Sequence, residues 1–200
     1  MFKNLMGKIP SMINIPLVLQ IFALINPFSS LPVLASAYTK KMNLKEIAMQ
    51  STFIALVVAI AMIFIGPFLF DVFNVSISAF RVAGGIIILL LGISTARAST
   101  ESSKVDTVEV LVSLIATPLL TGPATISFLT IKTYELGIFT ALVNTIVSFI
   151  LVGVVFFLFA SFIPKISMKI VGIISRVLGL FLTAVAIEML AAGIKGMFFV

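Results

Sequence analysis

Two similar segments decide the fold of this chain: NPFSSLP at residues 26–32 and TPLLTGP at residues 117–123. Each has a polar residue before a proline and a second proline five residues later. Proline removes a backbone donor and clashes with the carbonyl one turn back, so such a pair breaks or strongly kinks a helix. Because both segments lie inside long uncharged stretches, they predict two helices that are broken part-way.

A second pair of similar segments indicates an internal repeat. RVAG at residues 81–84 is matched by RVLG at residues 176–179, and the two motifs recur in the same order after 91 and 95 residues. Self-similarity at a nearly fixed period is the signature of a duplicated unit. We therefore divide the chain into repeats at residues 1–100 and 101–200, which together form one membrane domain.

The composition excludes a soluble globular enzyme. Of the 200 residues, 61% are apolar and 10% are charged, and the mean hydropathy is +1.31, whereas about 25% of residues are charged in an average soluble domain. The absence of His and Cys removes Cys- or His-ligated zinc sites, thiol chemistry and His-based triads. The net charge of +6 then fits basic loops beside a membrane better than nucleic-acid binding.

Charged residues delimit six expected transmembrane helices, since ~20 mostly apolar residues cross a bilayer. Their expected ranges are 12–38, 44–67, 76–97, 108–134, 137–163 and 168–193. Three spans per repeat is an odd number, so the second repeat enters the membrane from the opposite side. The predicted fold is all-α, with two inverted three-helix repeats, an architecture found in many secondary transporters.

Basic residues predict the orientation. The three loops on one side of the membrane carry seven basic residues: Lys40, Lys41, Lys45, Arg97, Lys104, Lys165 and Lys169. The termini and the two loops on the other side carry four: Lys3, Lys8, Lys132 and Lys195. The positive-inside rule places the first group in the cytoplasm and both termini outside. No small-residue cleavage motif follows the first apolar run, so we retain that run as a span and not as a signal peptide.

The two broken helices predict a binding site near the middle of the bilayer. Half-helix N-termini suit a carboxylate, and unwound carbonyls suit an ammonium group, so a small amino acid is the expected ligand. The alternative is that both breaks are structural kinks whose hydroxyls bond to the helix backbone. The candidate substrate-binding residues are Asn26, Pro27, Ser29, Ser30, Thr117, Pro118, Thr121, Gly122 and Thr125.

Three charged residues lie inside the expected spans and away from their ends: Arg81, Arg176 and Glu188. Intramembrane ionisable groups are functional candidates by default. Glu188 could relay a proton or pair with a cation, or it could face water near the outer end of its helix. The two arginines could snorkel to the interface, bond carbonyls freed by the broken helices, or bind a substrate carboxylate.

These motifs together resemble the MarC family over essentially the whole chain, and within it the SnatA-like carriers of small neutral amino acids. The resemblance rests on the two proline segments, on AFRVAGG at residues 79–85, and on RVLG through AAGI at residues 176–194. It implies a six-span protein of the cytoplasmic (inner) membrane, distantly similar to LysE-type amino-acid exporters. It also implies glycine and alanine as substrates, bound near residues 26–32 and 117–125.

Two classes of function remain after this comparison. The first is a secondary transporter of small neutral amino acids, which would use no cofactor and be driven by an H⁺ or Na⁺ gradient. Within this class, the alternative is a carrier or exporter of another small solute, including drugs. The second is an accessory membrane protein. An enzyme is not expected, because no Asp/Glu pair lies within a span, and no P-loop is present to use ATP. The expected partners are the lipid bilayer and the amino acid, with a homo-oligomer left open.

Overall fold

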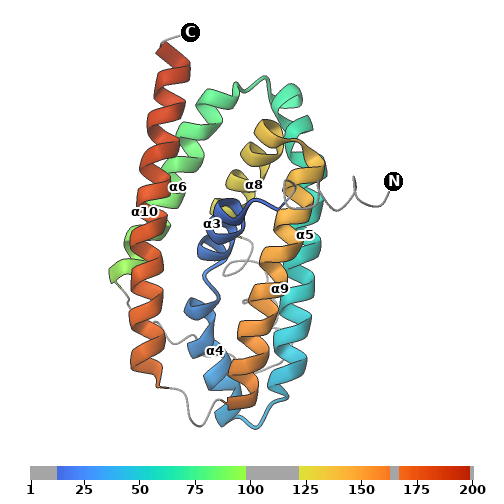
Figure 1. The fold of residues 1–200 in the computed structure, drawn as a ribbon, viewed down its shortest axis with the longest axis vertical. Coiled ribbons are helices and arrows are strands. Elements are labelled where there is room, and N and C mark those ends of the chain that lie inside the picture. The colour runs from blue at the N-terminus through green and yellow to red at the C-terminus, as the bar shows by residue number, and fades with distance from the viewer. Residues whose placement is uncertain (1–12, 98–121, 163–166, 199–200) are drawn as a thin grey trace, which may run out of the picture.

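The computed structural model describes residues 13–97, 122–162 and 167–198, and these fold as a bundle of helices (Figure 1). No strand occurs in these three ranges, so the prediction of an all-α protein is confirmed for them. The helices are α3 (Ile15–Ile25), α4 (Pro27–Thr39), α5 (Leu44–Phe73), α6 (Ile77–Arg97), α8 (Pro123–Leu136), α9 (Ile138–Phe162) and α10 (Met168–Phe198).

Four of these helices are long and apolar enough to cross a membrane: α5, α6, α9 and α10. They coincide with four of the six expected spans, although two are longer than expected. α5 continues through Pro67 to Phe73, and α10 continues past Gly193 to Phe198. Membrane helices tolerate an internal proline where neighbouring helices and hydroxyl side chains compensate for the freed backbone groups. Pro67 was therefore the wrong place to end the second span.

The first expected span, 12–38, is broken as predicted. Asn26 ends α3 in the left-handed region, with φ 42° and ψ 67°, and its backbone N–H donates to the carbonyl of Phe22. α4 begins at Pro27, which has no N–H to continue the ladder of α3. The second proline of the motif has no such effect, because α4 continues past residue 32.

Only the second half of the other broken span is described. α8 begins at Pro123, directly after Gly122. Residues 108–121 of the expected span, which include Thr117, Pro118 and Thr121, lie outside the described residues. Whether a helix precedes this break therefore stays a prediction.

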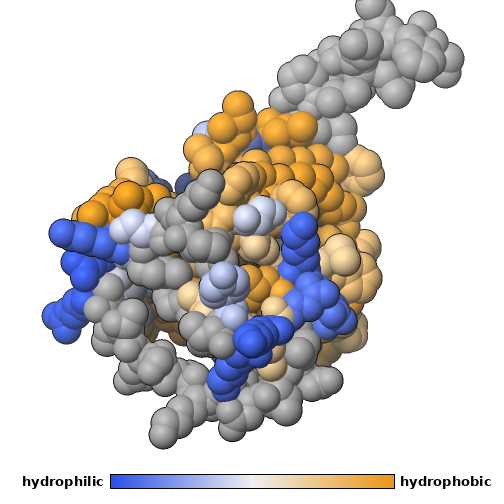
Figure 2. All heavy atoms as spheres, turned by 90° about the horizontal axis from the view of Figure 1, so that it is seen from below, coloured by the Kyte–Doolittle hydropathy of each residue, from blue (hydrophilic) through white to orange (hydrophobic). Residues whose placement is uncertain are grey.

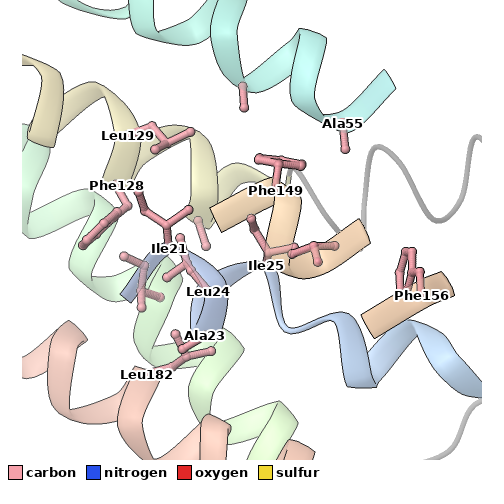
Figure 3. Packing of buried hydrophobic residues seen from close by; sticks show 14 of the residues in the cluster. Ile21, Ala23, Leu24, Ile25, Ala55, Phe128, Leu129, Phe149, Phe156 and Leu182 are labelled. Atoms are coloured by element: carbon pink, nitrogen blue, oxygen red, sulfur yellow. The ribbon is translucent and has the colours of Figure 1, made fainter. Parts of the chain in front are cut away.

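The long helices form two pairs with the short helices between them (Figure 1). α6 lies beside α10, α5 lies beside α9, and α3, α4 and α8 occupy the space between the pairs. α3 is buried on most of its circumference, as expected for a central helix. Figure 3 shows Ile21 and Ile25 of α3 directed into the core with Phe128 of α8 and Phe149 of α9.

Glycines bring α6 and α10 into close antiparallel contact. A Cβ on Gly179 would lie 2.6 Å from the backbone nitrogen of Ala96, and one on Gly193 would lie 2.9 Å from the carbonyl oxygen of Ser78. Small residues allow such backbone approach between membrane helices, where association depends on packing more than on the hydrophobic effect. The RVLG repeat motif therefore supplies, through Gly179, a helix contact.

The outer surface is hydrophobic, as a membrane-spanning bundle requires. Phe53, Phe64, Phe139 and Phe181 point outward and are each more than half exposed. Figure 2 looks along the bundle onto the end where α4 meets α5, and hydrophilic side chains gather there while the flanks are hydrophobic. So many large apolar side chains on the outer surface indicate that this surface faces the hydrocarbon of a lipid bilayer.

The glycine contact gives a matched prediction on α10. Gly179→Ala forces α6 and α10 apart and is expected to destabilise the protein by about 1–3 kcal/mol, as other overpacked contacts do. Gly172→Ala is the control, because nothing lies within 4 Å of a Cβ there; it is expected to be neutral or stabilising by up to ~1 kcal/mol through helix propensity. Thermal unfolding in detergent measures both, and equal melting temperatures would contradict the close contact.

Candidate functional site

The break at Asn26 places an asparagine side chain in the interior of the bundle. Asn26 is 3% exposed, and its Nδ2 donates to the hydroxyl of Ser175 on α10 at 3.2 Å. The Asn26 carbonyl accepts the Ser29 N–H at 3.0 Å and the Ser29 hydroxyl at 2.8 Å. Its side-chain Oδ1 is buried without a partner in the described part of the chain, so an acceptor is available inside the bundle.

Three hydroxyls share this condition. The Oγ atoms of Ser30 on α4 and Ser51 on α5, and the Oγ1 atom of Thr145 on α9, are completely buried and bond to nothing within the three described ranges. A buried polar group without a hydrogen bond costs about 1–3 kcal/mol, and native proteins rarely leave one without a reason. Together with Asn26, these residues give four helix segments a buried polar group without a partner in the described ranges.

α8 begins with an exposed proline and enters the bundle within one residue. Gly122 is the extended N-cap residue and provides no side-chain hydrogen bond, and Pro123 is the first helical residue. Ala124 and Thr125, which follow, are 3% and 2% exposed. First-turn N–H groups have no partner within their own helix and carry the positive end of the helix dipole. This start is therefore suited to an anionic group.

The structure describes part of the predicted site. Asn26, Pro27 and Ser30 lie at the junction of α3 and α4, and Gly122 and Thr125 lie at the start of α8; all of these except Gly122 are buried. Ser29 is half-buried and its hydroxyl bonds to the backbone, which is the role that the alternative interpretation assigned to it. The other predicted members, Thr117, Pro118 and Thr121, are outside the described ranges.

Sequence reasoning missed several polar residues on the neighbouring helices. Ser51, Thr145 and Ser175 contribute buried hydroxyls. On α9, the side-chain oxygen of Asn144 accepts the backbone N–H of Asn14 at 2.7 Å. One turn later, the Ser148 hydroxyl lies 2.7 Å from the backbone carbonyl oxygen of Asn144 and 3.1 Å from the backbone carbonyl oxygen of Val18 on α3. The available signal was the four-residue spacing of Asn144 and Ser148 within an apolar stretch, which places both on one helix face. These two residues hold α3 against α9.

Buried hydroxyls with and without partners provide a second prediction. Ser51→Ala removes an unsatisfied group and is expected to stabilise the ligand-free protein by about 1 kcal/mol, because replacing such a group relieves a desolvation cost. Ser148→Ala is the control, since its hydroxyl is bonded; it is expected to destabilise by a similar amount. Unfolding in detergent without added solute measures both variants. A loss of stability in Ser51→Ala would show that its hydroxyl is satisfied.

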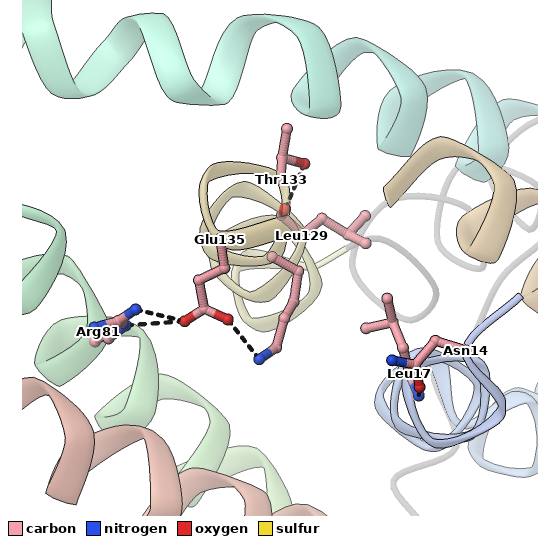
Figure 4. Close-up of polar contacts among 7 residues, drawn as sticks. Asn14, Leu17, Arg81, Leu129, Thr133 and Glu135 are labelled. Atoms are coloured by element: carbon pink, nitrogen blue, oxygen red, sulfur yellow. Dashed lines mark hydrogen bonds and ion pairs between the residues drawn. The ribbon is translucent and has the colours of Figure 1, made fainter. Parts of the chain in front are cut away.

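An ion cluster ties the end of α8 to α6 (Figure 4). Glu135 accepts from Nη2 and Nε of Arg81 at 2.6 and 3.1 Å, and from Nζ of Lys132 at 2.8 Å. Partial burial alone would raise the pKa of the Glu135 carboxyl, but the hydrogen bonds and charges of Lys132 and Arg81 outweigh it and lower the pKa below its usual value. Arg81 thus meets a carboxylate of the chain itself.

Arg176 and Glu188 have different surroundings from Arg81. Both side chains are exposed on α10, whereas the Arg81 side chain is 23% exposed in its ion pair. The two repeat-related arginines therefore do not share one structural role in the described residues. Glu188 lies on the outward face of a spanning helix, next to the exposed Ile187.

The lowered pKa of Glu135 predicts a pH-dependent stability. Since the folded-state pKa lies below the unfolded value of about 4.5, the stabilisation is complete above that value and is lost as the pH falls through the folded pKa. The effect is expected to be about 1 kcal/mol for this partly exposed group. Glu135→Gln removes this pH dependence, which melting temperatures measured between neutral and acidic pH would detect. Glu46→Gln, at an exposed position in the first turn of α5, is the control. It is expected to keep the pH-dependent stabilisation from Glu135.

The fold and its surface define an integral, multi-pass membrane protein with a helix interrupted at the buried Asn26. The sequence profile of the MarC family of integral membrane proteins matches residues 12–198, so the chain belongs to this family.

Similar proteins are known in bacteria and archaea. The UPF0056 membrane protein YvbG of Bacillus subtilis is 29% identical over 90% of this chain and 93% of its own length. The UPF0056 membrane proteins of Methanocaldococcus jannaschii and Pyrococcus abyssi are 28% and 30% identical, covering 88% and 89% of this chain and 93% and 92% of their own lengths. No solved structure matches the chain.

Proposed function

We propose that this protein is a secondary transporter that moves small neutral amino acids such as glycine and alanine across the cytoplasmic membrane by alternating access. The observation that carries the proposal is the interruption at Asn26, which leaves a buried amide oxygen without a partner in the described interior. Irregular backbone at membrane depth is tolerated where it is buried in protein or lines a cavity. In transporters, such interrupted helices commonly form the substrate site.

The polar groups around the interruptions suit a small zwitterion. The Oδ1 atom of Asn26 is an acceptor for an ammonium group, and the uncapped start of α8 supplies donors for a carboxylate. The ion cluster of Arg81, Lys132 and Glu135 lies near the far end of α8 from Gly122, so it is not part of this arrangement. Backbone and uncharged side chains would therefore bind both charges of the ligand.

Helix directions support two inverted repeats as the basis of alternating access. α5 and α9 occupy corresponding positions in residues 1–100 and 101–200 and run in opposite directions side by side, as do α6 and α10 (Figure 1). Each pair would then join one helix from each half. An exchange of roles between such halves produces inward-open and outward-open states.

The remaining parts of the proposal follow the sequence-based expectations. An H⁺ or Na⁺ gradient would drive transport without a cofactor, and Glu188 of α10 would be the coupling acid. Both termini would lie outside the cytoplasm. A carrier of another small solute, including drugs, is the second candidate, and competition in the transport assay separates the two.

Counterflow of labelled glycine in proteoliposomes tests the proposal. Asn26→Gly preserves the left-handed backbone while removing the amide, and it is expected to reduce glycine counterflow at least about tenfold, which corresponds to ~1.4 kcal/mol of lost interaction. Asn74→Gly is the matched control, because Asn74 is also left-handed, with φ 49°, but is exposed between α5 and α6. It is expected to transport at the wild-type rate.

Each result in this assay has a separate meaning. Absence of glycine and alanine counterflow in folded wild-type protein overturns the proposed substrates. Wild-type counterflow in Asn26→Gly would instead remove Asn26 from the site. Unlabelled drugs that compete where alanine does not would favour the second candidate.

A further inference from the structure

An apolar groove runs between α5 and α9 on the outer surface of the bundle. It has a volume of about 520 Å³ and is lined by residues 45–56 in the first turns of α5 and residues 146–157 in the middle of α9. Gly153 leaves free space in the groove, because the nearest atom to a Cβ at this position would be the Thr52 methyl carbon, 3.9 Å away. The Thr52 hydroxyl donates to the Ala48 carbonyl at 2.7 Å, so its polarity is already satisfied.

The groove opens sideways toward the bilayer. Met49, Phe53 and Phe157 form its rims and are 72%, 65% and 57% exposed. α5 and α9 are both long enough to span the membrane, so lipid hydrocarbon is the surrounding solvent at this depth. A flexible apolar chain is therefore the occupant that such walls accept.

One end of the groove carries a positive charge. Lys45, in the first turn of α5, places its ammonium 5.4 Å from the centre of the Phe157 ring. The neighbouring Glu46 is engaged by Asn43 and Gln50, at 3.2 and 3.3 Å. No ion pair joins Lys45 to an acid in the described ranges. Lys41, in the turn before α5, is exposed on the same end.

We propose that this groove binds one anionic glycerophospholipid from the adjacent leaflet. One acyl chain lies in the groove beside Gly153, and the phosphate lies at Lys45, where the chain leaves the hydrocarbon. Basic residues next to membrane helices attract anionic headgroups in this way, and the aromatic ring of Phe157 helps to hold the lysine there. The inference concerns a different face from the interrupted helices and does not depend on the proposed transport function.

Native mass spectrometry of the detergent-solubilised full chain tests this site, with phosphatidylglycerol and phosphatidylcholine as the added lipids. Wild-type protein is expected to retain one phosphatidylglycerol in preference to phosphatidylcholine. Lys45→Gln is expected to weaken phosphatidylglycerol retention about fivefold, as for one basic residue near a headgroup, and to abolish the preference. Gly153→Phe fills the groove and is expected to abolish retention of both lipids.

The matched control is Gly172→Phe, which adds the same ring to another helix position where nothing lies within 4 Å of a Cβ. It is expected to retain phosphatidylglycerol like the wild type, and its melting temperature shows whether such a substitution leaves the fold intact. Equal retention of the two lipids by the wild type would overturn the headgroup assignment. Retention that survives Gly153→Phe, or a dimer that Gly153→Phe dissociates, would overturn the groove as a lipid site.

Discussion

The need to satisfy backbone hydrogen bonds away from water governs this structure. In lipid, an unpaired N–H or C=O has no solvent to accept or donate to it, yet the chain interrupts a helix at the buried Asn26 and begins another at Pro123, directly before the buried Ala124 and Thr125. The surrounding helices make this possible. α3 and α8 are shielded between the α5–α9 and α6–α10 pairs, and the Ser29 hydroxyl donates to the carbonyl of Asn26 at the break.

The two helix pairs are built differently, and this difference suits different tasks. Backbone approaches backbone where Gly92 and Gly179 meet between α6 and α10, so small displacements there produce clashes. Between α5 and α9 the groove at Gly153 leaves space. Packed interfaces resist continuous deformation, so the glycine contact forms the stiffer side of the bundle and the groove forms its more adaptable side.

Much of the fold followed from local chemistry, whereas the site required tertiary proximity. Charge spacing located the four long helices, and the proline chemistry of Asn26–Pro27 located the break, because both effects act within a few residues. The positions of prolines and charges in the sequence could not show that α4 continues past its second proline or that α5 continues through Pro67. Whether a helix continues through a proline depends on the packing of neighbouring helices. Likewise, Ser51 and Ser175 contact the interior only through packing of distant segments. Arg81 was recognised as unusual, but its partner Glu135 lies 54 residues away and was treated as part of a loop.

The ion cluster at Glu135 has a mechanical consequence. It fastens the C-terminal end of α8 to α6, and α8 is buried along its length between its neighbours. The cluster therefore fixes the position of α8 along its own axis relative to α6. A shift of α6 along its axis would carry α8 with it, together with the peptide groups at the start of α8.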